Sequence, residues 1–208
     1  MLQPKEIAEA ARAFPAQTAQ TYDGFHPRHY ALLSEESLKC VGALMALMEA
    51  TGHIPTQLQA ILLVLLSKPT GDFRPIGLFP SLYRLWGKCR RPYATKWEAE
   101  HDRPYFAGGK GTSAIETVWR QAARAEAGIA KDKLAVTVLW DLVKYYATIL
   151  LPRLVEAGQR QGFSMQIMRL SVNMYGCGRH IQMHNMVKWP YYALCGIIAG
   201  CPFATTYT

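Results

Sequence analysis

The chain has 208 residues, half of them hydrophobic, which is enough apolar side chain to bury a core and indicates a globular protein. Its 23 Lys and Arg exceed its 15 Asp and Glu, and the resulting net charge of +8 attracts polyanions, either nucleic acid or an anionic membrane surface. After Asp141 the one acidic residue is Glu156, whereas six Lys and Arg follow, so the second half is distinctly basic.

Cysteine content and hydropathy indicate in which cellular compartment the protein is expected. The five cysteines form no CxxC pair, which argues against a secreted disulfide framework and favours a reducing environment. The longest strongly apolar run, residues 60–66, is far shorter than the ~20 residues of a membrane-spanning helix, and the N-terminus lacks the apolar region of a signal peptide. We therefore expect a soluble intracellular protein, nuclear or cytoplasmic, with no membrane partner.

The first 54 residues predict helical structure. Residues 1–20 contain helix formers without a clear apolar stripe, so a short helix and a frayed end both remain open. Residues 34–37 resemble a helix start, and apolar residues then recur at helical spacing until Gly52. This pattern predicts an amphipathic helix, whose apolar positions are Leu38, Val41, Leu44, Met45 and Met48.

Strands and a further helix are expected next. The apolar run 61–66 ends in a cluster of turn residues, 67–72, which favours a buried strand leading into a loop, and Pro75 begins an extended segment. A helix is expected from Pro80. Its apolar face consists of Leu82, Leu85, Trp86 and Cys89, beside a cationic face of Arg84, Lys88, Arg90 and Arg91.

The second half alternates turns with regular elements. A glycine-rich turn at 108–113 precedes a predicted helix at 114–129, and two more helices are expected at 151–161 and 165–175. Between the helices at 114–129 and 151–161, the near-continuous apolar run 134–140 predicts a strand buried on both faces, with Asp141 at its end.

Asp141 requires an explanation because a carboxylate at the end of a buried strand is costly unless it is paired or holds a cation. Two interpretations are open from the residue alone. Asp is a favoured N-cap for a following helix, and it is also a common ligand of divalent cations.

The residues around Asp141 resemble the first palm motif of reverse transcriptases, an Asp followed five residues later by Phe or Tyr. The resemblance implies that Asp141 and the backbone carbonyl of Leu142 hold Mg²⁺, or Mn²⁺ in its place. It also implies that Tyr146 is the steric gate that excludes a 2′-hydroxyl.

Two upstream stretches resemble the fingers segment of non-LTR retrotransposon and group II intron reverse transcriptases. They are Lys68-Pro69 and Phe73-Arg74-Pro75-Ile76-Gly77-Leu78. In that family, fingers Lys and Arg residues bind the triphosphate of the incoming nucleotide. The resemblance therefore assigns triphosphate binding to Lys68 and Arg74, since a polyanion that develops charge needs nearby cations.

Two further blocks follow in the family's order. Residues 106–115 are similar to its block of a Phe, a glycine turn and an apolar helix, and residues 196–204 resemble its second palm motif. The second resemblance implies that Gly200 lets the backbone approach the nascent base pair. Ala199 stands where the family usually has Gln, and residues 204–206 replace its usual Ser-Pro.

The resemblance implies an α+β fold, namely a fragment of a right-hand polymerase. The expected regions are an N-terminal helical extension (1–54), helical and β fingers (55–130) and a partial palm (131–208) whose antiparallel sheet is flanked by helices. The implied partners are an RNA template, a DNA primer and deoxynucleoside triphosphates. The family's Asp-Asp hairpin follows the second palm motif, and the sequence stops at Thr208, before it, so the chain is expected to be inactive alone.

Two alternatives remain for the function. One is a non-catalytic remnant that holds nucleic acid through its basic surface. The other is a fragment of a viral RNA-dependent RNA polymerase, which Gly200 and Thr205 favour, whereas Tyr146 favours deoxynucleotides.

Overall fold

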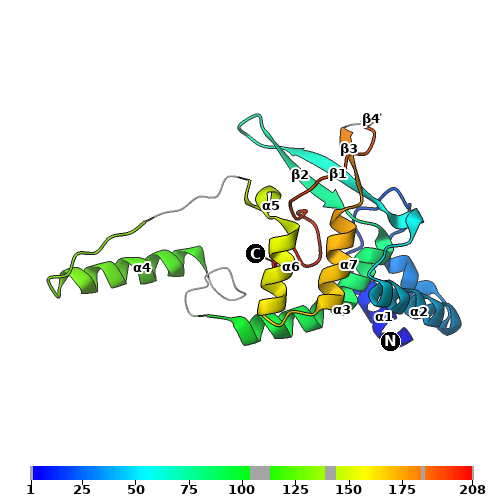
Figure 1. Ribbon diagram of the computed structural model, residues 1–208, viewed down its shortest axis with the longest axis horizontal. Coiled ribbons are helices and arrows are strands. Elements are labelled where there is room, and N and C mark those ends of the chain that lie inside the picture. The colour runs from blue at the N-terminus through cyan, green and yellow to red at the C-terminus, as the bar shows by residue number, and fades with distance from the viewer. Residues whose placement is uncertain (1, 104–112, 139–143, 184–185, 208) are drawn as a thin grey trace. The chain divides into compact units, whose positions relative to one another are not determined.

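The computed structural model describes residues 2–103, 113–138, 144–183 and 186–207 (Figure 1). Its contacts divide the chain into two compact units, Met1–Lys96 with Lys144–Thr208, and Trp97–Val143. This division does not test the three regions expected from the sequence, which stay a prediction.

The first unit combines helices with one sheet. Its helices are α1 (Pro4–Arg12), η1 (Pro27–Leu32), α2 (Glu35–Thr51), η2 (Thr56–Leu58), the first part of α3 (Ser81–His101), α5 (Tyr145–Thr148), α6 (Leu151–Arg160) and α7 (Met165–Tyr175). Its strands are β1 (Ala60–Ser67), β2 (Phe73–Leu78), β3 (Gly178–Met183) and β4 (Met186–Val187). The expected α+β class is confirmed.

The sheet has the strand order β2-β1-β3-β4 and is mixed, whereas an antiparallel sheet was expected. The pairs β1–β2 and β3–β4 are antiparallel, but β1 and β3 run parallel, with Leu63 opposite Ile181. Parallel pairing needs a long crossover connection, and the chain between β1 and β3 supplies one that includes α6 and α7. The antiparallel prediction was therefore wrong for the central pair.

The helix predicted between Ser34 and Gly52 is confirmed as α2. The Ser34 side chain accepts a hydrogen bond from the amide of Ser37 and so caps the N-terminus, and Gly52 ends the helix with φ 69°. Three of the predicted apolar residues are buried, whereas Leu44 is 39% exposed. The buried ones are Leu38, Met45 and Met48.

The strand, turn and helix predicted from residue 61 onward are also confirmed as elements, although Leu66 at the end of the strand is exposed and Cys89 of the helix is half-buried. The run 61–66 lies in β1, the turn closes with a hydrogen bond from the amide of Lys68 to the carbonyl of Asp72 (2.7 Å), and β2 follows. Helix α3 buries the predicted Leu82, Leu85 and Trp86, and Tyr83 in addition.

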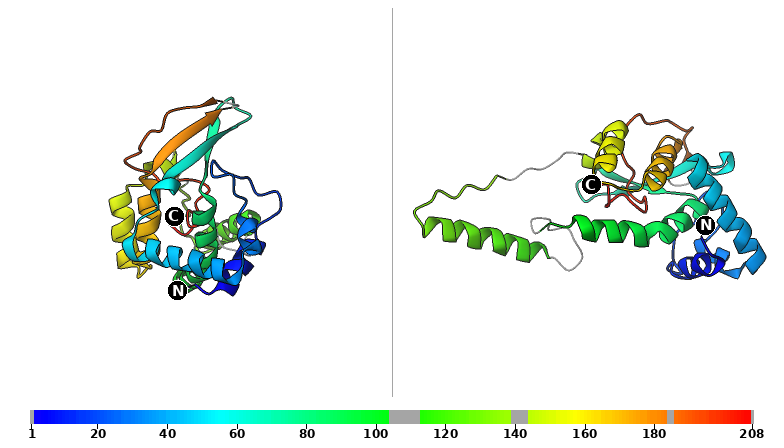
Figure 2. Two further views of the ribbon diagram at one scale, coloured as in Figure 1. Left: turned by 90° about the vertical axis from the view of Figure 1, so that its right-hand side faces the viewer. Right: turned by 60° about the horizontal axis from the view of Figure 1, so that its bottom comes forward.

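The C-terminal segment packs on α3. Phe203 meets Trp86 edge to face at 5.5 Å between ring centroids, and the Tyr83 ring lies tilted between Trp86 (5.3 Å) and Phe79 (5.2 Å). Gly87 of α3 leaves room for Pro202, because a Cβ there would lie 2.5 Å from the proline ring. Figure 2 shows this segment in red, between α3 and the pair α6–α7. It thus lies in the core of the first unit.

The second unit contains α4 (Ala114–Ile129), which confirms the helix predicted there, with Ser113 as its N-cap. The strand expected at 134–140 is wrong for the described residues 133–138, which form neither helix nor strand. A strand needs a neighbour to satisfy its backbone groups. Here the run is instead linked to α4 by a hydrogen bond from the Gln121 amide to the Thr137 hydroxyl (3.2 Å), and Leu134 is 97% exposed.

In the described part of the chain, no helix is both long and apolar enough to cross a membrane. Residues 104–112, which include most of the predicted glycine turn, and residues 139–143, which include Asp141 and Leu142, lie outside the described residues.

An ion pair between the buried Glu49 and the half-buried Arg90 joins α2 to α3. Glu49 is 8% exposed, and its carboxylate accepts hydrogen bonds from the indole of Trp86 and from the guanidinium of Arg90 (both 2.7 Å). The hydrogen bond to Glu49 raises the pKa of Arg90. Removing one partner of a buried pair leaves the other charge uncompensated, which is far more costly than losing an exposed pair.

We therefore predict that Glu49→Gln lowers the free energy of unfolding by on the order of 3 kcal/mol. The matched control is Glu35→Gln on the same helix, whose exposed pair with Lys39 (3.0 Å) contributes at most about 1 kcal/mol. Urea unfolding followed by circular dichroism measures both. Equal losses in the two variants would contradict the role given to Glu49.

Candidate functional site

The two predicted cationic residues lie on the β1–β2 hairpin. Arg74 lies on β2 opposite Leu66, and its side chain is exposed. Lys68 lies in the turn, where its ammonium is 3.8 Å from the Asp72 carboxylate. Both cations are therefore at the distal end of the hairpin and accessible to an anion.

Tyr146 lies in the short helix α5, which is joined to the segment predicted as the second palm motif. The carbonyl of Tyr146 accepts a hydrogen bond from the amide of Ile197 (2.9 Å), and the carbonyl of Ile149 accepts one from Gly196 (2.7 Å). Gly196 has φ 88°, and a Cβ there would lie 3.0 Å from Ala147. The turn that carries Tyr146 is thus held directly against residues 196 and 197.

Gly200 meets the backbone of β2. The amide of Gly77 donates to the carbonyl of Ala199 (2.8 Å), and a Cβ on Gly200 would overlap the carbonyl oxygen of Gly77. Gly200 also has φ 104°, a conformation that L side chains rarely adopt. A glycine is therefore required here by the fold itself, whatever contact it makes with a ligand.

These contacts bring together three segments that the sequence resemblance treats as separate blocks. Gly77 in β2, Tyr146 in α5 and Gly200 lie on segments joined by backbone hydrogen bonds. Arg74 is three residues along β2 from Gly77, or roughly 10 Å at the usual rise of a strand. Lys68 directly follows β1 and is five residues beyond Leu63, the partner of Gly77, or roughly 17 Å. Asp141 and Leu142 lie outside the described residues, so their assignment stays a prediction.

A buried polar cluster links residues 200–207 to α3 and α7. The hydroxyls of Tyr83 and Tyr207 both donate to the hydroxyl of Ser171, at 3.3 and 2.9 Å, and Tyr83 also contacts the thiol of Cys201 at 3.5 Å. Burial raises the pKa of Tyr83, Tyr207 and Cys201, so all three side chains stay neutral. The cluster fixes the segment without adding charge to it.

Arg179 on β3 is a site residue that the sequence analysis missed. It is 7% exposed, and its guanidinium donates to the carbonyls of Tyr175 (3.2 Å) and Gly196 (3.3 Å). No described carboxylate pairs with it, which leaves a buried positive charge behind the Gly196 turn. Only its place in a run of basic residues hinted at this role, because its partners are backbone atoms of distant segments.

Residues 144–207 contain six Lys and Arg but one acid. Glu156, the only acid after Asp141 in the sequence, is paired with Arg153 (3.0 Å) and Arg160 (2.6 Å). Its charge is therefore compensated locally. No other carboxylate of residues 144–207 therefore competes with a bound anion for the remaining basic residues.

Metal ligands are not assembled by the described residues. Among them, no group of three or more His, Cys, Asp or Glu side chains is placed to hold an ion. The prediction of Mg²⁺ or Mn²⁺ therefore continues to rest on Asp141 and Leu142 alone.

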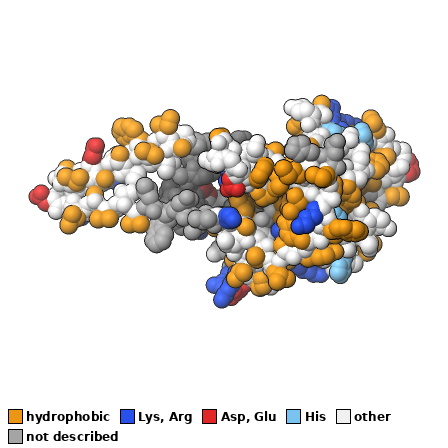
Figure 3. Space-filling view, turned by 90° about the horizontal axis from the view of Figure 1, so that it is seen from above, with side chains coloured by type: hydrophobic (Ala, Val, Ile, Leu, Met, Phe, Trp, Pro, Cys, Tyr) orange, Lys and Arg blue, Asp and Glu red, His pale blue; other side chains and the backbone are white. Residues whose placement is uncertain are grey.

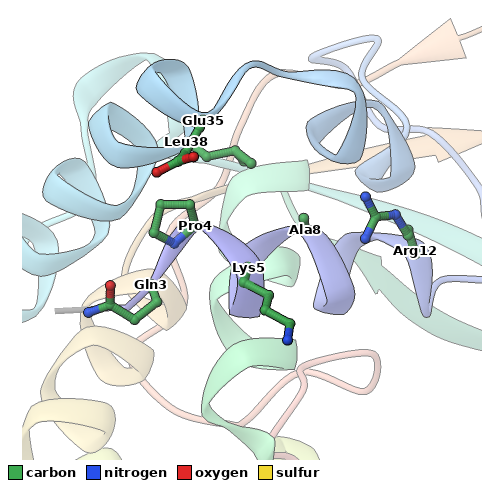
Figure 4. Close-up of a pocket in the computed structure, with 7 residues that line it drawn as sticks. All are labelled: Gln3, Pro4, Lys5, Ala8, Arg12, Glu35 and Leu38. Carbon is green, nitrogen blue, oxygen red and sulfur yellow. The ribbon is translucent and has the colours of Figure 1, made fainter.

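A separate groove of about 470 Å³ lies along α1, beside the first turn of α2 (Figure 4). Its polar lining includes Lys5, Arg12 and Glu35, and Glu35 is already paired with Lys39. None of the candidate site residues predicted from the sequence lines it. We assign it no part in the candidate site.

No protein-family model matches the chain, and no curated protein is significantly similar to it.

The contact between Gly200 and β2 gives a stability prediction. Gly200→Ala combines an unfavourable φ with overlap against Gly77, and we expect it to lower the free energy of unfolding by roughly 2–4 kcal/mol. Gly71→Ala is the matched control, because Gly71 has φ 82° but open space around it, so that about 1 kcal/mol is expected. Urea unfolding compares the two. A loss at position 200 no larger than that at position 71 would show that the close approach is not maintained in solution.

Proposed function

We propose that the chain is the fingers and partial palm of an RNA-directed DNA polymerase, which binds a template-primer and a deoxynucleoside triphosphate. One observation carries the proposal: the segments of β2, Tyr146 and Gly200, each matched separately to the family by sequence, are joined by backbone hydrogen bonds in the fold. If the resemblance were due to chance, there would be no reason for these three segments, which are spread over more than 100 residues, to lie in contact.

The proposed roles follow from the chemistry of these residues. Arg74 is exposed and presents a guanidinium, whose planar donors match phosphate oxygens, and Lys68 adds a second cation on the same hairpin. Tyr146 is half-buried beside Ala147 and Ile197, and its ring is proposed to limit the space at the 2′ position of the nucleotide.

A divalent cation enters this proposal only through Asp141 and the carbonyl of Leu142. When bound, such an ion neutralises charge that develops on the transferred phosphoryl group. The described residues would contribute the binding and orientation of the nucleotide, and we assign them no step of the chemistry itself.

A non-catalytic nucleic-acid-binding remnant is the second candidate. The observation that favours it is Ala199, which stands where the family's Gln is usual and whose carbonyl is engaged by the amide of Gly77. The positive surface would still bind nucleic acid in that case, because counterion release does not depend on nucleotide chemistry.

Nucleotide binding tests the roles of Arg74 and Tyr146. We expect the chain to bind a fluorescent dATP analogue more tightly than the matching ATP analogue, Arg74→Ala to weaken both, and Tyr146→Ala to abolish the preference. Lys39→Ala is the control, because Lys39 is an exposed cation on α2, paired with Glu35. If Arg74→Ala and Lys39→Ala bind the dATP analogue equally well, the hairpin does not hold the triphosphate.

Primer extension by a protein that joins residues 1–208 to the family's Asp-Asp hairpin separates the two candidates. The polymerase proposal predicts extension with Mg²⁺ or Mn²⁺ that Asp141→Ala abolishes, while template-primer affinity changes little. The 208-residue chain alone is expected to bind template-primer with an affinity that falls steeply as salt rises, and to give no extension. Extension that survives Asp141→Ala would refute the mechanism, and its absence from the joined protein would favour the remnant.

A further inference from the structure

The edge of the sheet beyond β3 carries residues 186–194, which include three exposed aromatic side chains and which we call the edge strip. It runs antiparallel to β3, with β4 at its start and a bridge between Arg179 and Tyr191. The amide of Lys188 donates to Ile181 (3.0 Å), and Arg179 and Tyr191 exchange two hydrogen bonds (2.9 and 3.0 Å). The strip is therefore a fixed part of the fold.

Its side chains are nevertheless uncovered. Trp189 is 88% exposed and Tyr192 is 69% exposed, and Lys188 beside them is also exposed. Gly178 in β3 positions the strip, because the ring of Tyr192 and Pro190 both lie close to where its Cβ would be (3.6 and 3.1 Å). Large aromatic side chains thus stand exposed on an edge that is hydrogen-bonded to β3, which is costly unless a partner covers them.

Charge indicates which partner fits. The strip contains no acidic residue, and the one acid of residues 144–207 is Glu156, paired with Arg153 and Arg160. In Figure 3 the end of the sheet that carries β3 and β4 faces the viewer, and hydrophobic side chains cover a broad area interrupted by Lys and Arg. Single-stranded nucleic acid combines the two complementary features, since it offers unstacked base faces along a polyanionic backbone.

We propose that the edge strip binds single-stranded nucleic acid by stacking unpaired bases on Trp189 and Tyr192, with Lys188 at the phosphates. The inference shares with the proposed function the premise that the chain binds nucleic acid. It requires neither the nucleotide site around Arg74 nor Asp141. It therefore names a separate surface, which would hold an unpaired stretch of template.

The test uses a 12-nucleotide single-stranded RNA and its abasic counterpart, with fluorescence anisotropy as the readout. Removing an aromatic that stacks on a base costs ~1–3 kcal/mol, so Trp189→Ala and Tyr192→Ala should each raise the Kd for RNA by roughly 5- to 150-fold. The abasic strand, which keeps the phosphates, should bind the wild type and these variants equally. Lys188→Ala should instead lower the slope of log K against log salt by about 0.7.

Trp119→Ala is the matched control, because Trp119 on α4 is 72% exposed but lies in the second unit. It should leave RNA affinity unchanged. All three aromatic variants should keep the wild-type urea midpoint, since the side chains are mostly exposed and such substitutions change stability by about 0.5 kcal/mol or less. Trp189→Phe should retain part of the affinity, because it keeps a stacking face.

Several results would overturn the inference. Wild-type RNA affinity in Trp189→Ala, or equal losses for RNA and the abasic strand, would exclude base stacking. Binding of phosphatidylserine vesicles that requires Trp189, without an effect of Trp189 on RNA, would assign the strip to a membrane surface instead. A different result would contradict the polymerase proposal alone: the Arg74→Ala variant would bind dATP as tightly as the wild type, while Trp189→Ala would still weaken RNA binding.

Discussion

The C-terminal segment lies between the sheet and α3 because a glycine on each side leaves it room. Ile198 occupies the space where Gly77 has no side chain, and Pro202 does the same at Gly87. A larger residue at either position would move the segment away from the aromatic face of α3, where Phe203 meets Trp86. Because residues 196–200 belong to the same segment, the geometry of the candidate site depends on this packing.

The sequence predicts the elements whose signals are local. Helix α2 was recognisable from its cap and its apolar spacing, and β1 from an apolar run that ends in turn residues. Strand β3 has no such signal, because four of its six residues are Gly, Arg, His and Gln, and its parallel partner β1 lies more than 100 residues away. The run 134–140 has a strong strand signal, yet its described residues form no strand. Apolar and β-branched residues favour a strand but do not show whether a partner strand exists.

The candidate site shows the same division. The sequence singled out Arg74, Tyr146 and Gly200, and the fold joins their segments through backbone contacts, although their roles toward a nucleotide remain our proposal. It did not single out Arg179 or the edge strip. Both are defined by interactions between distant segments: a guanidinium that meets two carbonyls, and an aromatic run that a glycine in β3 positions.

The most direct measurement of the central claim is photo-crosslinking with 8-azido-dATP in the presence of Mg²⁺, followed by mass spectrometry of the labelled peptides. If β2, α5 and the Gly196–Gly200 segment form one nucleotide-binding surface, label should appear on peptides that contain residues 73–78 together with 145–149 or 196–200. Unlabelled dATP should compete with it. Label confined to other peptides, such as those lining the α1–α2 groove, or label that dATP does not displace, would contradict the account.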